Sequence, residues 1–77
     1  NKVEVDFYVP DERLAIQVSY SITQSPATYE REVNALKRIP GVLSCNRRLI
    51  LTNDESDRIE DSFGTIEVMP VWKWLLQ

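Results

Sequence analysis

Two neighbouring runs near the start of the chain alternate apolar and polar residues with a period of two. The first run covers residues 3–9 and the second covers residues 14–22. A period of two is typical of strands with one face turned to a core. The short polar stretch 10–13 between the runs predicts that they form a β-hairpin.

The predicted register of this hairpin separates an apolar face from a polar one. With residues 10–13 as the loop, Phe7 lies opposite Ile16, and Val5 lies opposite Val18. That face is wholly apolar. The other face carries four polar residues in two cross-strand pairs, Asp6 with Gln17 and Glu4 with Ser19. This polar cluster is either a solvated sheet face or the remains of a metal site.

The next segment predicts a helix over residues 26–39. Ser25 supplies a capping hydroxyl, and Pro26 suits the first turn. The early acids Glu30 and Glu32 suit the helix dipole, and we expect them on a solvent-exposed face. One apolar stripe recurs at intervals of four and three residues: Tyr29, Val33, Leu36 and Ile39.

The remaining chain predicts two strands and a terminal helix. Residues 49–52 are a short apolar run typical of a strand buried on both faces, and the order strand, helix, strand indicates a parallel crossover. Just before this run, Arg47 and Arg48 are adjacent, so in a strand they point to opposite faces. Residues 65–69 predict another strand, and Pro70 begins a terminal helix that contains two tryptophans. The expected fold is therefore α/β with a mixed sheet, in the order ββαββα.

An acidic segment separates the last two predicted strands. It does not fit the calcium-binding EF-hand, because the ligand positions and the glycine of that loop are missing. We expect a solvated loop or a short helical turn here. Its five acids are Asp54, Glu55, Asp57, Glu60 and Asp61.

Length and charge limit the classes of function. The 77 residues fit one domain with a modest core, and no apolar run approaches the roughly 18 residues of a membrane span. A net charge of -3 and a pI near 4.8 have the wrong sign for a domain that mainly grips a phosphate backbone. Neither a membrane nor a nucleic acid is the expected partner.

Residue types that are scarce exclude several chemistries. The chain has no histidine, so it cannot supply the base of a Ser-His-Asp or Cys-His system. Cys45 is the only cysteine, which rules out an internal disulfide, fits a cytoplasmic location and favours a small core side chain. Two glycines cannot form a phosphate-binding loop, so we expect no cofactor in this chain. A start at Asn1 without an initiator methionine suggests an excised piece of a longer protein.

Several short motifs in order resemble the C-terminal domain of a family of prokaryotic AAA+ ATPases. They are EVDF at residues 4–7, IQVSY at 16–20, YERE at 29–32, LILT at 49–52 and IEVMPVWKWL at 66–75. In that family, a P-loop module that uses ATP and Mg²⁺ precedes a domain whose fold is similar to the PD-(D/E)XK restriction-endonuclease superfamily. The resemblance implies that residues 1–77 are a single C-terminal nuclease-like domain, a fragment of a longer ATPase chain. It also implies a restriction-endonuclease-like core that lacks its N-terminal elements.

The resemblance gives the polar cluster a meaning. Active members of the nuclease superfamily bind Mg²⁺ with an aspartate on one strand and an acid or glutamine on the next, followed two residues later by lysine. Asp6 matches the aspartate, Gln17 matches the acid or glutamine, and Ser19 stands where the lysine belongs, with Glu4 as the nearby reserve. One carboxylate, an amide and a hydroxyl make a poor site for a hard cation.

The expected function is a non-catalytic accessory or interaction domain of an AAA+ ATPase, with no catalytic residue and no metal of its own. Its expected partners are its own N-terminal ATPase module and, by self-association, further copies of itself. One alternative is a degenerate nuclease-like domain that binds DNA or RNA without cutting. Another is a residual metal-dependent nuclease.

Overall fold

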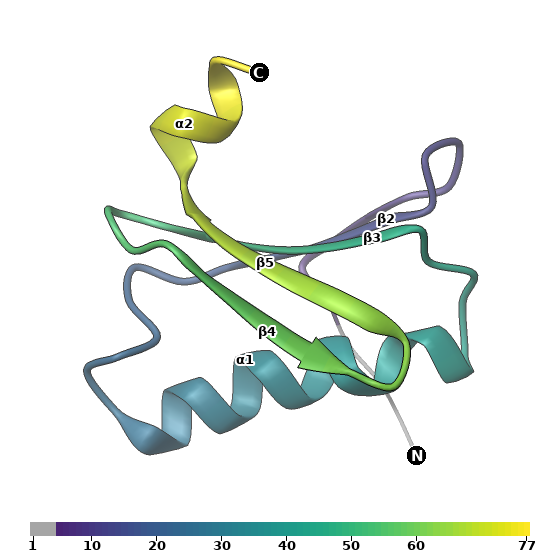
Figure 1. Cartoon of the computed structure of the whole chain (residues 1–77), viewed down its shortest axis with the longest axis horizontal. Helices are drawn as coiled ribbons and strands as arrows, with labels where there is room; N and C mark the ends of the chain where they lie inside the picture. The colour runs from purple at the N-terminus through teal and green to yellow at the C-terminus, as the bar shows by residue number, and fades with distance from the viewer. Residues whose placement is uncertain (1–4) are drawn as a thin grey trace.

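A computed structural model describes residues 5–77, which form one mixed sheet with a helix on each side (Figure 1). The sheet has five strands in the order β1-β2-β3-β5-β4. The three inner strands are parallel, and the edge strands β1 and β4 each pair antiparallel with their neighbour. The mixed α/β fold is therefore confirmed. In chain order the elements are β1 (Phe7–Val9), β2 (Leu14–Val18), α1 (Pro26–Arg38), the 3₁₀ turn η1 (Ile39–Gly41), β3 (Arg47–Thr52), β4 (Asp57–Asp61), β5 (Gly64–Pro70) and α2 (Val71–Leu75).

The predicted hairpin is present, but both of its strands are shorter than expected. Phe7 pairs with Ile16, which confirms the predicted register. The backbone bends at Asp6, however, and Val5 packs on the core beneath α1 instead of pairing with Val18. The predicted pair of Val5 with Val18 is therefore wrong, because the strand begins only after the bend.

Helix α1 follows the predicted stripe in part, because three of its four residues are buried while the first, Tyr29, is 37% exposed. Ser25 is its N-cap, and the Ser25 hydroxyl accepts a hydrogen bond from the Thr28 N–H at 3.4 Å. Val33 and Leu36 from the stripe are fully buried against the sheet, and Ile39 continues the same contact from the 3₁₀ turn. Helix α1 connects two parallel strands, β2 and β3, so the predicted crossover is confirmed.

The sheet separates two apolar layers, one on each face. Strand β3 supplies both, because successive residues point to opposite faces: Ile50 to the layer under α1 and Leu51 to the layer under α2. The first layer consists of Ala15, Ile22, Val33, Leu36, Ile39, Ile50, Ile66 and Val68. The second consists of Leu14, Ile16, Leu49, Leu51 and Met69, with Val9 and Trp74 packed against it.

Strand β4 lies where the sequence predicted a loop or helical turn. The element order is thus ββαβββα, and the predicted ββαββα misses one strand. Ile59, the only apolar residue of β4, packs against the layer under α1, while Asp57, Arg58 and Glu60 face solvent. Charged residues are typical of edge strands, because they discourage pairing with another chain. Asp57 and Glu60 are therefore features of a protected sheet edge, whereas Asp54 and Glu55 do lie in a loop, as predicted.

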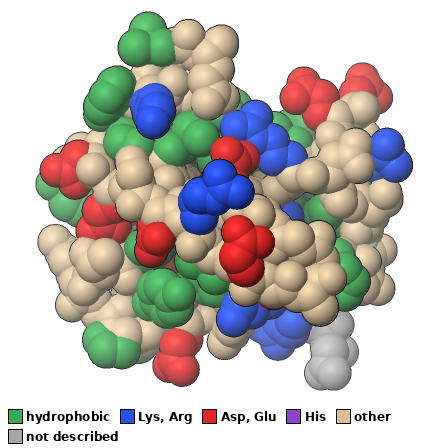
Figure 2. Space-filling model, in the orientation of Figure 1, with side chains coloured by type: hydrophobic (Ala, Val, Ile, Leu, Met, Phe, Trp, Pro, Cys, Tyr) green, Lys and Arg blue, Asp and Glu red, His purple; other side chains and the backbone are tan. Residues whose placement is uncertain are grey.

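The two helices cover the sheet unequally. Helix α1 is 13 residues long, whereas α2 has 5 and packs mainly through Trp74. The remaining large side chains of α2 stay exposed, and apolar side chains gather at its end of the molecule (Figure 2). None of the helices in residues 5–77 is long and apolar enough to cross a membrane. The exposed apolar residues of this terminal segment are Val71, Trp72, Leu75 and Leu76.

Candidate functional site

The candidate site lies between the N-terminal hairpin and α1. Gln17 is on β2 and points to the sheet face beneath α1, where only 5% of its surface is exposed. The interpretation of this polar cluster as a solvated sheet face is therefore wrong for Gln17. The cause is the alternation of β2, which turns Ile16 to the α2 layer and its neighbour Gln17 to the helix.

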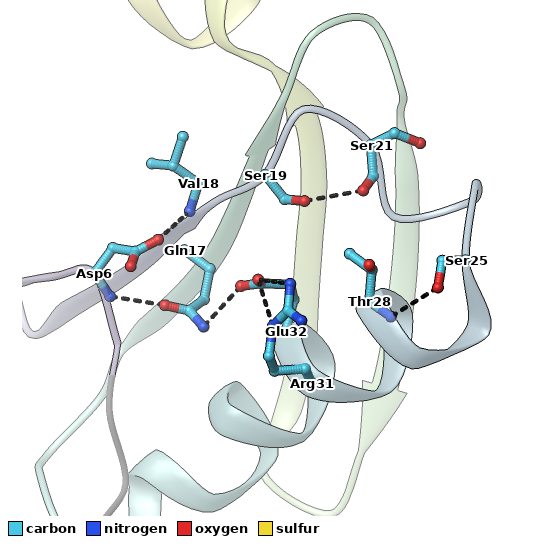
Figure 3. A network of polar contacts seen from close by, with 9 residues as sticks. All are labelled: Asp6, Gln17, Val18, Ser19, Ser21, Ser25, Thr28, Arg31 and Glu32. Atoms are coloured by element: carbon cyan, nitrogen blue, oxygen red, sulfur yellow. Dashed lines mark hydrogen bonds and ion pairs between the residues drawn. The ribbon is translucent and has the colours of Figure 1, made fainter.

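Asp6 and Gln17 are joined, but not as a pair of side chains. The Asp6 backbone N–H donates to Gln17 Oε1 at 2.7 Å, and the Val18 N–H donates to Asp6 Oδ2 at 2.8 Å (Figure 3). Each side chain thus accepts a hydrogen bond from a backbone N–H of the opposite segment of the hairpin. These two bonds fasten the bend before β1 to the end of β2, where regular strand pairing has stopped.

Glu32 completes the cluster, although the sequence pattern did not indicate it as a residue of this site. Gln17 Nε2 donates to Glu32 Oε1 at 2.9 Å, and Arg31 contacts the other carboxylate oxygen at 3.4 Å. Glu32 is only 9% exposed, so its expected place on a solvent-exposed helix face is wrong. Its spacing from Leu36 and Ile39, four and then three residues, is the signal that places it on the inner face.

The other two predicted site residues are not brought into this cluster. The Ser19 hydroxyl, at the position of the superfamily lysine, donates to the Ser21 carbonyl oxygen at 2.9 Å. It belongs to the β2–α1 loop. Glu4 lies outside the described residues, as does its predicted pairing with Ser19. Of the four predicted residues, the described structure joins Asp6 and Gln17.

An open pocket of about 480 Å³ lies beside the cluster. Its polar wall combines opposite charges, with the carboxylates of Asp6 and Glu32 near the guanidinium groups of Arg31 and Arg38. Val5 and Ala35 supply the apolar part of the lining. The two arginines favour a phosphate in this pocket, and the two carboxylates oppose one.

The residues of this site do not fit Mg²⁺. A hard cation needs several oxygen ligands that converge on one point. Here the Gln17 amide directs its N–H₂ at Glu32, while its oxygen and one Asp6 oxygen already accept backbone N–H groups. Within residues 5–77, no three side chains of the types that bind metals are grouped as a ligand set.

A second polar cluster fixes the loop between β2 and α1. Glu55 accepts hydrogen bonds from the Ser21 hydroxyl at 2.6 Å, the Thr23 hydroxyl at 2.5 Å and the Ile22 N–H at 2.8 Å. The hydroxyl of Ser21, followed by the other donors, holds the pKa of Glu55 below its ordinary value. This acid is therefore a loop anchor and not a free member of a solvated acidic segment.

The adjacent arginines of β3 take separate structural roles. Arg48 makes two 2.7 Å hydrogen bonds to Asp61 and one of 3.0 Å to the Leu36 carbonyl oxygen, beneath α1. Arg47 lies on the other face and contacts Glu67 at 2.6 Å, so the predicted opposite directions are confirmed. Hydrogen bonds from Arg48 lower the pKa of Asp61.

Burial raises the pKa of the Cys45 thiol, as suits a packing role.

A comparison of the chain with protein-family models, with curated proteins and with solved structures finds no match. The resemblance to AAA+ C-terminal domains therefore rests on the short motifs of the sequence itself.

Proposed function

We propose that this chain is a non-catalytic interaction domain, the C-terminal accessory domain of a cytoplasmic AAA+ ATPase. Its partner in this proposal is the ATPase module of its own protein. The motifs at residues 4–7, 16–20 and 66–75 support the family. The proposal gives this chain no cofactor, and it assigns ATP and Mg²⁺ to the module.

The observation that carries the interaction role is the exposed apolar surface of the terminal segment, formed by α2 and the following Leu76. Trp72 is 56% exposed and Leu76 is 80% exposed, although both are large enough to stabilise a contact strongly. Trp74, two residues from each, is the side chain that α2 uses to pack on its own sheet. Contiguous apolar groups left in water are typical of protein-binding surfaces, and tryptophan is frequent among the residues that dominate binding energy.

The geometry of the candidate site supports the non-catalytic part. Gln17 uses its amide oxygen to join β2 to the bend before β1, and its amide nitrogen to join β2 to α1. Ser19, at the lysine position, bonds within its own loop. Side chains committed in this way stabilise the fold, which supports a role in structure over a role in catalysis.

Binding to the ATPase module tests the proposal directly. Trp72→Asp should weaken binding of the 77-residue chain to the purified module by at least about tenfold, since a charge would enter an apolar contact. Phe63→Asp is the matched control, because Phe63 is an exposed aromatic residue at the opposite end of β5. Titration calorimetry gives both affinities. Equal affinity for wild type and Trp72→Asp would remove α2 from the interface.

The family part of the proposal has its own test in the gene. A parent reading frame that belongs to the AAA+ family encodes GxxxxGK, followed by serine or threonine, upstream of Asn1. Sequencing the parent gene decides this, and a frame without that loop would contradict the ATPase assignment.

A second candidate function is binding of DNA or RNA without cleavage. The observation that favours it is the placement of Arg31 and Arg38 in the pocket beside Asp6. Fluorescence anisotropy with labelled DNA and RNA would then show binding that weakens with salt. Arg38→Ala should reduce it more than Arg58→Ala, which changes an arginine on β4. Equal effects of the two substitutions would count against this candidate.

A further inference from the structure

We propose that a notch between β4 and α2 binds the carboxylate of an acidic side chain from a protein partner, whose apolar side chains pack on the adjoining terminal segment. The notch has a volume of about 440 Å³, and its lining comes from β4, β5 and α2. This proposal deepens the interaction role proposed above and rests on it, because it names the chemistry of the partner's surface. It does not depend on which protein supplies that surface.

Two cations line the notch, and they come from different elements. Arg58 is on β4, and the exposed Lys73 is on α2. Within residues 5–77, Lys73 takes part in no ion pair, and Arg58 is paired only with Glu60, at 4.0 Å. Both side chains of that pair are exposed, so it contributes little to stability. Arg58 and Lys73 are therefore available to a carboxylate from another chain.

The two acids of the notch oppose a further carboxylate only in part. Glu67 is paired at 2.6 Å with Arg47, which lies on β3 outside the lining of the notch. Asp57 accepts a hydrogen bond from the Arg58 backbone N–H at 2.7 Å. Because Arg47 balances the charge of Glu67, the two cations of the notch stand against one remaining carboxylate. The local balance favours an anion, although the chain as a whole has a net charge of -3.

The notch adjoins the exposed apolar residues of the terminal segment. Lys73 lies in the chain between Trp74, which packs on the sheet, and Trp72, which is exposed. Met69 adds an apolar residue to the notch itself. Lys and Arg side chains lie on the same face of the molecule as the apolar side chains at the α2 end (Figure 2). An acid flanked by apolar residues matches this surface, because its carboxylate meets Lys73 while its neighbours cover Trp72.

An NMR titration of the isotope-labelled chain with two blocked pentapeptides tests the proposal. The peptides are acetyl-Ala-Leu-Glu-Leu-Ala-amide and acetyl-Ala-Leu-Gln-Leu-Ala-amide, which differ in a single charge. At low salt, the glutamate peptide should bind about threefold more tightly than the glutamine peptide, with shifts in the amide signals of β4, β5 and α2. Lys73→Met should abolish this difference. Lys37→Met is the matched control and should keep it, because it removes the same charge from α1 on the other side of the sheet.

The possible results separate this proposal from the proposed interaction role. Equal binding of the two peptides to wild type would overturn the notch as a carboxylate site, and so would a preference for glutamate that persists in Lys73→Met. Binding of neither peptide, or shifts confined to other elements, would also contradict the proposal. The affinity of the ATPase module for Trp72→Asp is a separate measurement, so the interaction role can hold when the notch proposal fails.

Discussion

Arg48 is the least exposed charged residue in the described part of the chain, at 3% exposure. Its guanidinium group has two partners on different elements, the Asp61 carboxylate on β4 and the Leu36 carbonyl oxygen on α1. A buried guanidinium group is stable only when such partners replace its water. This one residue therefore joins the central strand to the sheet edge and to the helix.

Removing the Asp61 carboxylate should destabilise the fold strongly, because the Arg48 charge would stay buried without its main partner. We expect Asp61→Ala to lower the free energy of unfolding by about 3 kcal/mol, as measured by urea denaturation. Arg58→Ala is the control, since its contact with Glu60 is 4.0 Å long and both side chains are exposed. It should change stability by no more than about 0.5 kcal/mol. Equal losses for the two variants would contradict the structural role of Arg48.

At the scale of elements, the sequence predicts those features of the fold that depend on local periodicity. The pairing of Phe7 with Ile16 follows from period-two alternation and loop length. Helical spacing accounts for the burial of Val33, Leu36 and Ile39, although Tyr29 of the same stripe is exposed. Strand β4 was missed because only Ile59 among its residues is apolar, and an edge strand needs few apolar contacts.

The candidate site was predictable only in part for a related reason. Asp6 and Gln17 belong to one hairpin, so their proximity follows from its register. Glu32 reaches them from α1, and that contact depends on how the helix packs across the sheet. Its charge suggested a solvent-exposed position, whereas the buried partner Gln17 makes an inner position stable. Contacts between elements distant in sequence are not encoded in a local period.

The β2–α1 loop depends on Glu55, and this gives stability a specific pH dependence. The pKa of Glu55 is lower in the folded chain than the ordinary value of 4.5, mainly because the Ser21 and Thr23 hydroxyls bond to its carboxylate. The stabilisation is therefore present above the unfolded pKa and is lost as pH falls through the folded pKa. The pKa of Asp61 is also lowered and acts in the same direction.

We expect the free energy of unfolding to be nearly constant from neutral pH down to about pH 5 and to fall below that. Glu55→Gln should be less stable at pH 7, because one amide oxygen cannot replace both carboxylate oxygens that bond the loop. It should also lose less stability than wild type between neutral and acidic pH. Denaturant titrations across this range measure both effects, and parallel pH profiles for the two proteins would show that Glu55 does not anchor the loop.

The whole molecule is asymmetric in how its sheet is covered. One face lies under the long helix α1, while the other carries the five residues of α2 and the second apolar layer. Phe7 and Val18 are exposed on the hairpin, and Trp72 and Leu76 are exposed in the terminal segment. A net charge of -3 is so small that charge repulsion alone does not prevent contact between apolar surfaces of two molecules.

We therefore predict that the isolated chain self-associates when its partner is absent. The contact would be made by the exposed apolar residues of the terminal segment: Val71, Trp72, Leu75 and Leu76. Light scattering should show a mass that rises as the concentration increases from micromolar to millimolar. Leu76→Asp should shift the mass toward the monomer, because it places a charge in the apolar contact, whereas Phe63→Asp should not. If the ATPase module binds the same surface, adding it should suppress self-association by competition. A chain that stays monomeric at millimolar concentration would contradict the prediction, and self-association that persists in Leu76→Asp would place the contact elsewhere.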